Sequence, residues 1–212
     1  MRYLRSAGAV TALVESLPGD PSRAAPRDAW HPDPGMSSSF VVDLFNAVGR
    51  VNEKLAVRAA DHVLAWPKTY GLDKVVVPGT RQLIESVMIG DNTAVQRLRI
   101  ACRDHLRTRV AEPLEAPRDW SRVNDLACRC PHCSDLGRFL ADPARRIWTL
   151  KAAENVRGHV EETIRKARCD LDAATDRRGR PYSLVCTKNQ ASYDRRMKQR
   201  QQDLENLAVL DG

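Results

Sequence analysis

The heptapeptide ACRCPHC, residues 127–133, contains three of the six cysteines of the chain: Cys128, Cys130 and Cys133. A Cys-x-x-Cys loop such as Cys130-Pro-His-Cys133 presents two thiolates from one turn and commonly forms half of a tetrahedral zinc site. Clustered cysteines also form disulfide frameworks in exported proteins, and redox or nucleophilic thiols in enzymes. The motif is therefore compatible with a metal site, a disulfide framework or a reactive thiol, and the rest of the sequence has to distinguish among these three.

The two ligands that a tetrahedral zinc site still needs have candidates farther along the chain. His159 lies at the edge of the apolar face of a predicted helix, and Cys169 lies where that helix should end. Cys128 and His132 are substitutes, because Cys128 is only two positions from Cys130 and the chain would have to curl for both to face one ion. We therefore predict a closed, structural zinc site held by Cys130, Cys133, His159 and Cys169.

Two alternatives to zinc stay open at this point. The spacing does not match two short Cys-x-x-Cys loops, or one loop followed by a close histidine pair, so unconnected thiols remain an alternative. A redox dithiol would prefer a βαβ setting, which the flanking pattern does not predict. Arg5 and Glu15 interrupt the apolar stretch near the start of the chain, so we expect no export signal, a cytoplasmic location and no disulfide framework.

The apolar periodicity predicts a mainly α fold, a helical bundle followed by a small α+β zinc-binding module with a β-hairpin. An N-terminal helix and Pro-rich linker should occupy residues 1–38, a helical domain residues 39–123, and the module residues 124–212. The linker assignment depends on the Pro, Gly and Ser density of residues 18–39. No run of 18 apolar residues occurs, so we expect no transmembrane helix and no membrane partner.

The helical domain should begin with one long amphipathic helix, or with a helix pair that is split near Gly49, and Pro67 should end it. We expect Thr80 to cap a further helix, and Asp91 or Asn92 to cap one that buries Cys102.

The module should contain a short helix over residues 136–140 and a longer one over 150–168. A strand near 171–175, a basic turn with Gly179 and Pro181, and a strand over 182–187 form the predicted hairpin. Asn189 or Ser192 should cap the final helix.

The C-terminal part of the chain resembles the C-terminal region of a group of fungal and bacterial 2-oxoglutarate/Fe(II) oxygenase-like proteins. The resemblance covers about residues 60–210 and rests on the segments GRFLADP and TDRRGRPYSLVCTKNQASY, on the Cys-x-x-Cys loop, and on His159 and Cys169. In those relatives this region follows an oxygenase domain. The resemblance therefore implies an oxygenase domain or another protein as partner. Its recurring residues here are Cys130, Cys133, His159, Cys169, Arg177, Arg178, Gly179, Pro181, Leu184, Val185, Thr187 and Lys188.

An oxygenase of this kind needs two His and one carboxylate on iron, mounted on a β-rich jelly roll. His31-Pro-Asp33 is a literal His-x-Asp, but it lies in the Pro-rich segment, and nearly everything that follows it toward His105 or His159 is predicted as helix or loop. We therefore expect the chain to be the non-catalytic end of such a protein; a part of the oxygenase itself is the lesser alternative.

The net charge of +7 and pI near 9.3 permit an acidic partner. The densest positive region comprises Arg177, Arg178, Arg180, Lys188, Arg195 and Arg196, which we consider as candidates for binding nucleic acid or another anion. Only Tyr182 and Tyr193 lie nearby for base stacking, and a solvated helix face explains the same charges.

The sequence contains no complete catalytic constellation. Its best interpretation is a zinc-stabilised interaction or accessory module, with nucleic-acid binding through the basic hairpin and last helix as the alternative.

Overall fold

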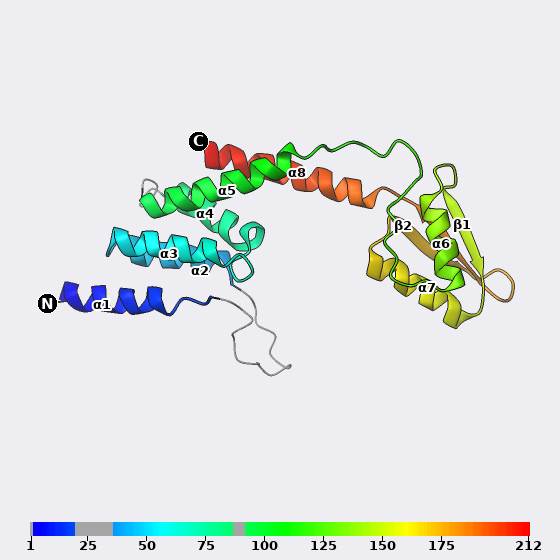
Figure 1. Ribbon diagram of the computed structural model, residues 1–212, viewed down its shortest axis with the longest axis horizontal. Coiled ribbons are helices and arrows are strands. Elements are labelled where there is room, and N and C mark those ends of the chain that lie inside the picture. The colour runs from blue at the N-terminus through cyan, green and yellow to red at the C-terminus, as the bar shows by residue number, and fades with distance from the viewer. Residues whose placement is uncertain (1, 20–35, 87–91) are drawn as a thin grey trace. The chain divides into compact units, whose positions relative to one another are not determined.

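The computed structural model describes residues 2–19, 36–86 and 92–212 (Figure 1). The chain divides into two compact units, the first formed by Met1–Glu112 with Arg200–Gly212 and the second by Pro113–Gln199. The first unit is helical, and the second contains the one sheet found within the described residues. The predicted fold class, mainly α with a small α+β part, is confirmed.

The boundaries of the units differ from the predicted ones. The second unit begins at Pro113 and not at residue 124, and the end of the last helix belongs to the first unit. The physical reason is that Asp203, Leu207 and Leu210 of that helix are buried, with both leucines in the apolar core of the first unit.

The first unit consists of α1 (Arg2–Glu15), α2 (Ser38–Gly49), α3 (Glu53–Ala65), the π-helical turn η2 (Leu72–Val76), α4 (Val77–Glu85), α5 (Thr93–Ala111) and residues from Arg200 onward of α8 (Ala191–Asp211). The predicted split near Gly49 is confirmed, because α3 restarts where the side chain of Asn52 accepts hydrogen bonds from the N–H groups of Lys54 and Leu55. Asn92 caps α5 in the same way, by accepting from the N–H of Ala94.

Thr80 does not cap a helix as predicted, since α4 begins earlier and Thr80 is buried inside it. The reason is that η2 runs directly into α4, so this helix needs no side-chain cap at its start. Cys102 is fully buried in α5, as expected, and its sulfur contacts the Thr80 hydroxyl at 3.7 Å. Burial raises the pKa of the Cys102 thiol to about 11, so this cysteine is an inert core residue.

A bidentate ion pair fixes the last helix to the first unit. The guanidinium of Arg109 donates to both carboxylate oxygens of Asp203, with each distance 2.7 Å, while Asp203 is only 1% exposed. The third nitrogen of Arg109 donates to Asp73 at 2.8 Å. One side chain of α5 therefore ties together α8 and η2.

The second unit consists of α6 (Pro131–Ala141), β1 (Ile147–Lys151), α7 (Glu154–Ala167), β2 (Leu171–Asp176), β3 (Ser183–Lys188) and the start of α8. The strands form an antiparallel sheet in the order β1-β3-β2, with Trp148 and Ala173 on either side of Cys186. The hairpin of β2 and β3 confirms the prediction. The buried cluster combines both helices with the sheet: Leu126, Cys133, Leu136, Phe139, Leu140, Trp148, Val160, Ile164, Leu171, Leu184 and Cys186.

Strand β1 was not predicted, and the helix expected from residue 150 begins only at Glu154. Trp148 and Leu150 lie opposite Cys186 and Leu184 of β3, and the Trp148 ring stacks on Phe139 of α6 with centroids 6.1 Å apart. Pairing with β3, whose residues come 32 to 40 positions later in the sequence, decides the conformation of this short segment, and local periodicity does not indicate it.

Replacing Asp203 with Ala should lower the free energy of unfolding of the first unit by about 2–3 kcal/mol, because Arg109 loses a buried, doubly hydrogen-bonded carboxylate. The measurement is a urea titration followed by the amide signals of α3 and α5. Leu204→Ala is the matched control, because Leu204 is exposed on the same helix and should change the value by less than about 0.5 kcal/mol. Equal effects of the two substitutions would refute the role given to the ion pair.

The stability of the first unit should also depend on the ionisation of Asp73. Hydrogen bonds from Arg109 hold the pKa of this carboxyl below its usual value of 3.8, so its contribution is complete above pH 3.8 and is lost as the pH falls through the lower pKa of the folded state. Asp73→Asn should therefore lower the free energy of unfolding at pH 6, with a difference from the wild type that shrinks below pH 3.8. A constant difference at both values of pH would contradict this.

Candidate metal centre

The Cys-x-x-Cys loop forms the first turn of α6. Cys130 is the N-cap residue, and its sulfur accepts a hydrogen bond from the N–H of Cys133 at 3.5 Å. Pro131 follows at the first helical position, where its missing N–H costs nothing. The backbone N–H of Ser134 closes the turn on the Cys130 carbonyl at 2.8 Å. The Cys130 sulfur is consequently held at the positive end of a helix, a place that favours a thiolate.

The segment before α6 curls and brings Cys128 to the same point. Leu126 is buried in the core of the second unit, and the Ser134 hydroxyl bonds to the carbonyl of Arg129 at 3.3 Å. Farther upstream, the Arg122 side chain donates to the carbonyl of Asn189 at 2.6 Å. These contacts fix a stretch without helix or strand, and they place the Cys128 sulfur beside those of Cys130 and Cys133.

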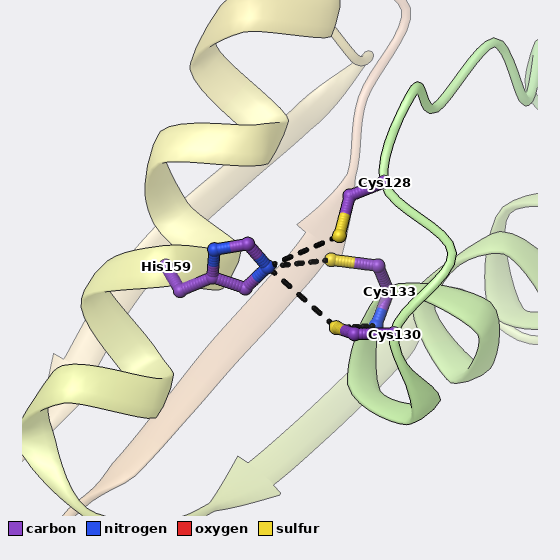
Figure 2. Close-up of side chains that lie close together, drawn as sticks. All are labelled: Cys128, Cys130, Cys133 and His159. Carbon is purple, nitrogen blue, oxygen red and sulfur yellow. Dashed lines mark hydrogen bonds between the residues drawn. The ribbon is translucent and has the colours of Figure 1, made fainter.

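His159 completes the cluster from α7. Figure 2 shows its imidazole facing the three sulfurs across the gap between α7 and the loop. The Nε2 atom lies 3.3 Å from the sulfur of Cys128, 3.6 Å from that of Cys130 and 3.4 Å from that of Cys133. All four ligand atoms lie within 4.8 Å of one another, and together they could hold a metal ion.

The spacing of these atoms can be compared with metal coordination. A tetrahedral zinc ion with Zn–S bonds of about 2.3 Å and a Zn–N bond of about 2.0–2.1 Å would hold sulfur and nitrogen about 3.6 Å apart. The three sulfur–nitrogen distances of 3.3–3.6 Å agree with this value. The side chains therefore need little movement to enclose a single ion.

The two thiols of the loop have opposite electrostatic environments. The N–H of Cys133 lowers the pKa of Cys130 to about 6, whereas burial raises the pKa of Cys133 to about 11. At neutral pH Cys130 is therefore a thiolate, while Cys133 holds its proton. A metal ion has to displace that proton, so its binding would release protons.

Cys169, predicted as the fourth ligand, lies outside the cluster, and Cys128 takes that place. Cys169 follows the end of α7, where Arg168 adopts a left-handed conformation, and it packs against the core of the second unit. From His159 to the end of α7 at Ala167 the helix rises by about 12 Å at 1.5 Å per residue, so His159 and the following Cys169 lie too far apart to bind one ion. The helix predicted from the sequence already ended near Cys169, so its length alone could have shown that His159 and Cys169 are too far apart. His132, the other substitute, is half-buried in the first turn of α6 and is not part of the cluster.

The six residues of the predicted basic surface have different environments in the structure: one is buried, two lie near carboxylates and three are exposed. Lys188 is only 1% exposed and donates to the carbonyl of Asp142 at 2.6 Å, so its inclusion among the anion-binding residues was wrong. Alternation along β3 puts it on the inner face with Leu184 and Cys186, beside the Phe139 ring at 4.4 Å. Arg178 pairs with Asp176, and Arg195 lies 3.8 Å from Asp170. The remaining predicted residues, Arg177, Arg180 and Arg196, are exposed.

His31 and Asp33 lie outside the described residues. Among the described helices, none is both long and apolar enough to cross a membrane. Comparison with protein-family models, curated proteins and solved structures gives no match. The resemblance to oxygenase-associated regions therefore stays a prediction from the sequence.

The ligand set can be tested with a pair of cysteine substitutions. Cys128→Ser should weaken binding of Co(II), used as a spectroscopic probe, by more than about 100-fold, because even residues that only support ligands are worth about 10–100-fold. It should also reduce the thiolate-to-metal absorption. Cys169→Ser, the matched control, should leave the spectrum and the affinity unchanged. The reverse pattern would restore the set predicted from the sequence.

Proposed function

We propose that the protein is a non-catalytic interaction module whose second unit is held together by one structural zinc ion. The observation that carries this proposal is the convergence of Cys128, Cys130, Cys133 and His159 from two separate elements onto one point.

The chemistry of the ligands favours zinc. Three thiolates and one imidazole form a soft, tetrahedral Cys₃His set, which is typical of structural zinc, whereas calcium and magnesium prefer oxygen ligands. Four protein ligands leave no open position for water or substrate, so we assign the ion no catalytic role.

The position of the cluster suggests what zinc does for the fold. The ion would join the curled segment and the first turn of α6 to the middle of α7, across the core of the second unit. The binding free energy of a structural zinc ion, about 10–16 kcal/mol, would then offset the ordering of a loop that has little apolar area of its own to bury.

A redox dithiol is the main competing interpretation, because Cys130 and Cys133 occupy a helix N-terminus, as redox pairs do. Such a pair needs no third thiol and no imidazole in contact with it. The presence of both Cys128 and His159 within 3.6 Å contacts of the cluster is explained by a metal and not by dithiol chemistry.

The interaction role is supported by the resemblance of the sequence to regions that follow an oxygenase domain. A protein partner, such as the oxygenase domain that the resemblance implies, is our first candidate. Nucleic acid is the weaker candidate, because the burial of Lys188 removes one cation from the row that would follow a phosphate backbone.

Metal analysis of protein purified without added metal should find one zinc ion per chain. A strong chelator under reducing conditions should then collapse the amide signals of β1, β2 and β3, while those of α3 and α5 persist. Cys133→Ser should mimic the chelator, and Cys169→Ser should behave as the wild type. A second unit that stays folded, with no zinc and with reduced thiols, would refute the proposal.

A further inference from the structure

A pocket of about 250 Å³, open to solvent and called the cavity below, lies in the second unit at the start of α7, and none of the four clustered ligands lines it. Its wall includes Arg157 and Glu154 from α7, and Arg180 and Tyr182 from the β2–β3 turn. It is thus a separate feature of the same helix that carries His159.

Arg157 is a buried cation without an acidic partner. It is only 7% exposed, and its guanidinium donates to two neutral acceptors, the carbonyl of Ala152 at 3.1 Å and the hydroxyl of Thr175 at 3.2 Å. Among the described residues no carboxylate forms an ion pair with Arg157, and the nearest acid in its hydrogen-bond network, Glu161, is reached through the Thr175 hydroxyl. A charge removed from water normally acquires a compensating group, and none is present here in the protein itself.

One nitrogen of Arg157 remains for a ligand. Its Nη2 group donates to none of the residues described, and it is not among the enclosed unpaired nitrogens, so it is open to the cavity. The Tyr182 ring lies 5.6 Å from the guanidinium carbon and, with the two hydrogen bonds, fixes the plane of the guanidinium. This donor is therefore already oriented.

The start of α7 adds backbone donors to the same cavity. Ala153 is the N-cap residue and provides no side-chain cap. The first intrahelical bonds come from the N–H groups of Val156 and Arg157, both to the carbonyl of Ala153, while those of Glu154 and Asn155 donate to no described residue. Free N–H groups and the positive end of the helix dipole attract anions.

Arg180 brings a second guanidinium from the turn between β2 and β3, and its side chain is exposed. Glu154 is the one acid in the wall, and it too is exposed, where a first-turn carboxylate can turn to solvent. The fixed charges around the cavity therefore sum to one positive charge, to which the helix end adds.

We propose that this cavity binds the phosphate group of a small phosphate monoester. Two guanidiniums at one helix N-terminus suit a compact dianion with several acceptor oxygens better than a single carboxylate. The donors meet at one point and do not form a row, so they suit a terminal phosphate better than the backbone of a nucleic acid. The site is independent of the metal that we assign to the cysteine cluster.

Inorganic phosphate is the first probe. Its addition at constant ionic strength should shift the amide signals of Glu154 and Asn155 and the Nε signal of Arg157 in a saturable manner. Arg180→Ala should weaken the binding about tenfold, the value of one charge-assisted hydrogen bond. Arg177→Ala is the matched control, because Arg177 is exposed in the same turn but does not line the cavity, and it should change the affinity less than twofold.

Two further ligands, phosphoserine and acetate, test whether the cavity prefers a phosphate group to a carboxylate. Phosphoserine, a small monoester, should bind at least as tightly as inorganic phosphate, whereas acetate should bind more weakly. Equal binding of acetate would overturn the assignment to phosphate. Tighter binding by an oligonucleotide without a terminal phosphate, or equal losses in Arg177→Ala and Arg180→Ala, would replace the site with a general basic surface.

Discussion

The second unit depends on the contact between the start of α6 and the middle of α7, where three sulfurs and one imidazole nitrogen face each other. The Nε2 atom of His159 lies 3.3–3.6 Å from all three sulfurs, and the four ligand atoms together could hold a single metal ion. In the function that we propose, a zinc ion would bind these thiols as thiolates and displace their protons. The ion would then link the curled segment and the first turn of α6 to the middle of α7.

Helix α7 has different functions on different faces. Arg157, Val160 and Ile164 are spaced by three and four residues, so they share the side that is buried against the sheet and α6. His159 and Thr163 lie on the neighbouring side, where the sulfur of Cys133 contacts both. With zinc bound, as we propose, the cluster would fix the position of α7, whose N-terminal end and Arg157 guanidinium line the cavity.

The first unit uses a different kind of link. Its apolar core runs through α2, α3, α4 and α5, but the last helix of the chain joins it through a buried carboxylate as well as through leucines. A buried ion pair adds little net stability when compared with apolar residues of similar size. It is favourable only when its charged groups are well aligned for hydrogen bonding. Arg109 holds Asp203 and Asp73 in fixed directions, which defines the register of α8 against α5.

Local sequence patterns were enough to predict the helices of the first unit, the hairpin, and the Cys-x-x-Cys loop that supplies two residues of the cluster. These features depend on local signals: apolar spacing for the helices, Asn52 and Asn92 as caps, Gly179 in the turn, and a Cys-x-x-Cys loop. Tertiary structure decided the rest. Strand β1 exists through its partner β3, Lys188 is buried because of the side of the sheet on which it falls, and the last helix belongs to the first unit through Asp203. The choice of Cys128 over Cys169 follows from rise along a helix and from the curl of an irregular segment. The rise of the helix could have been calculated from the sequence. The curl of the segment depends on side chains from distant parts of the chain that meet only in the folded protein.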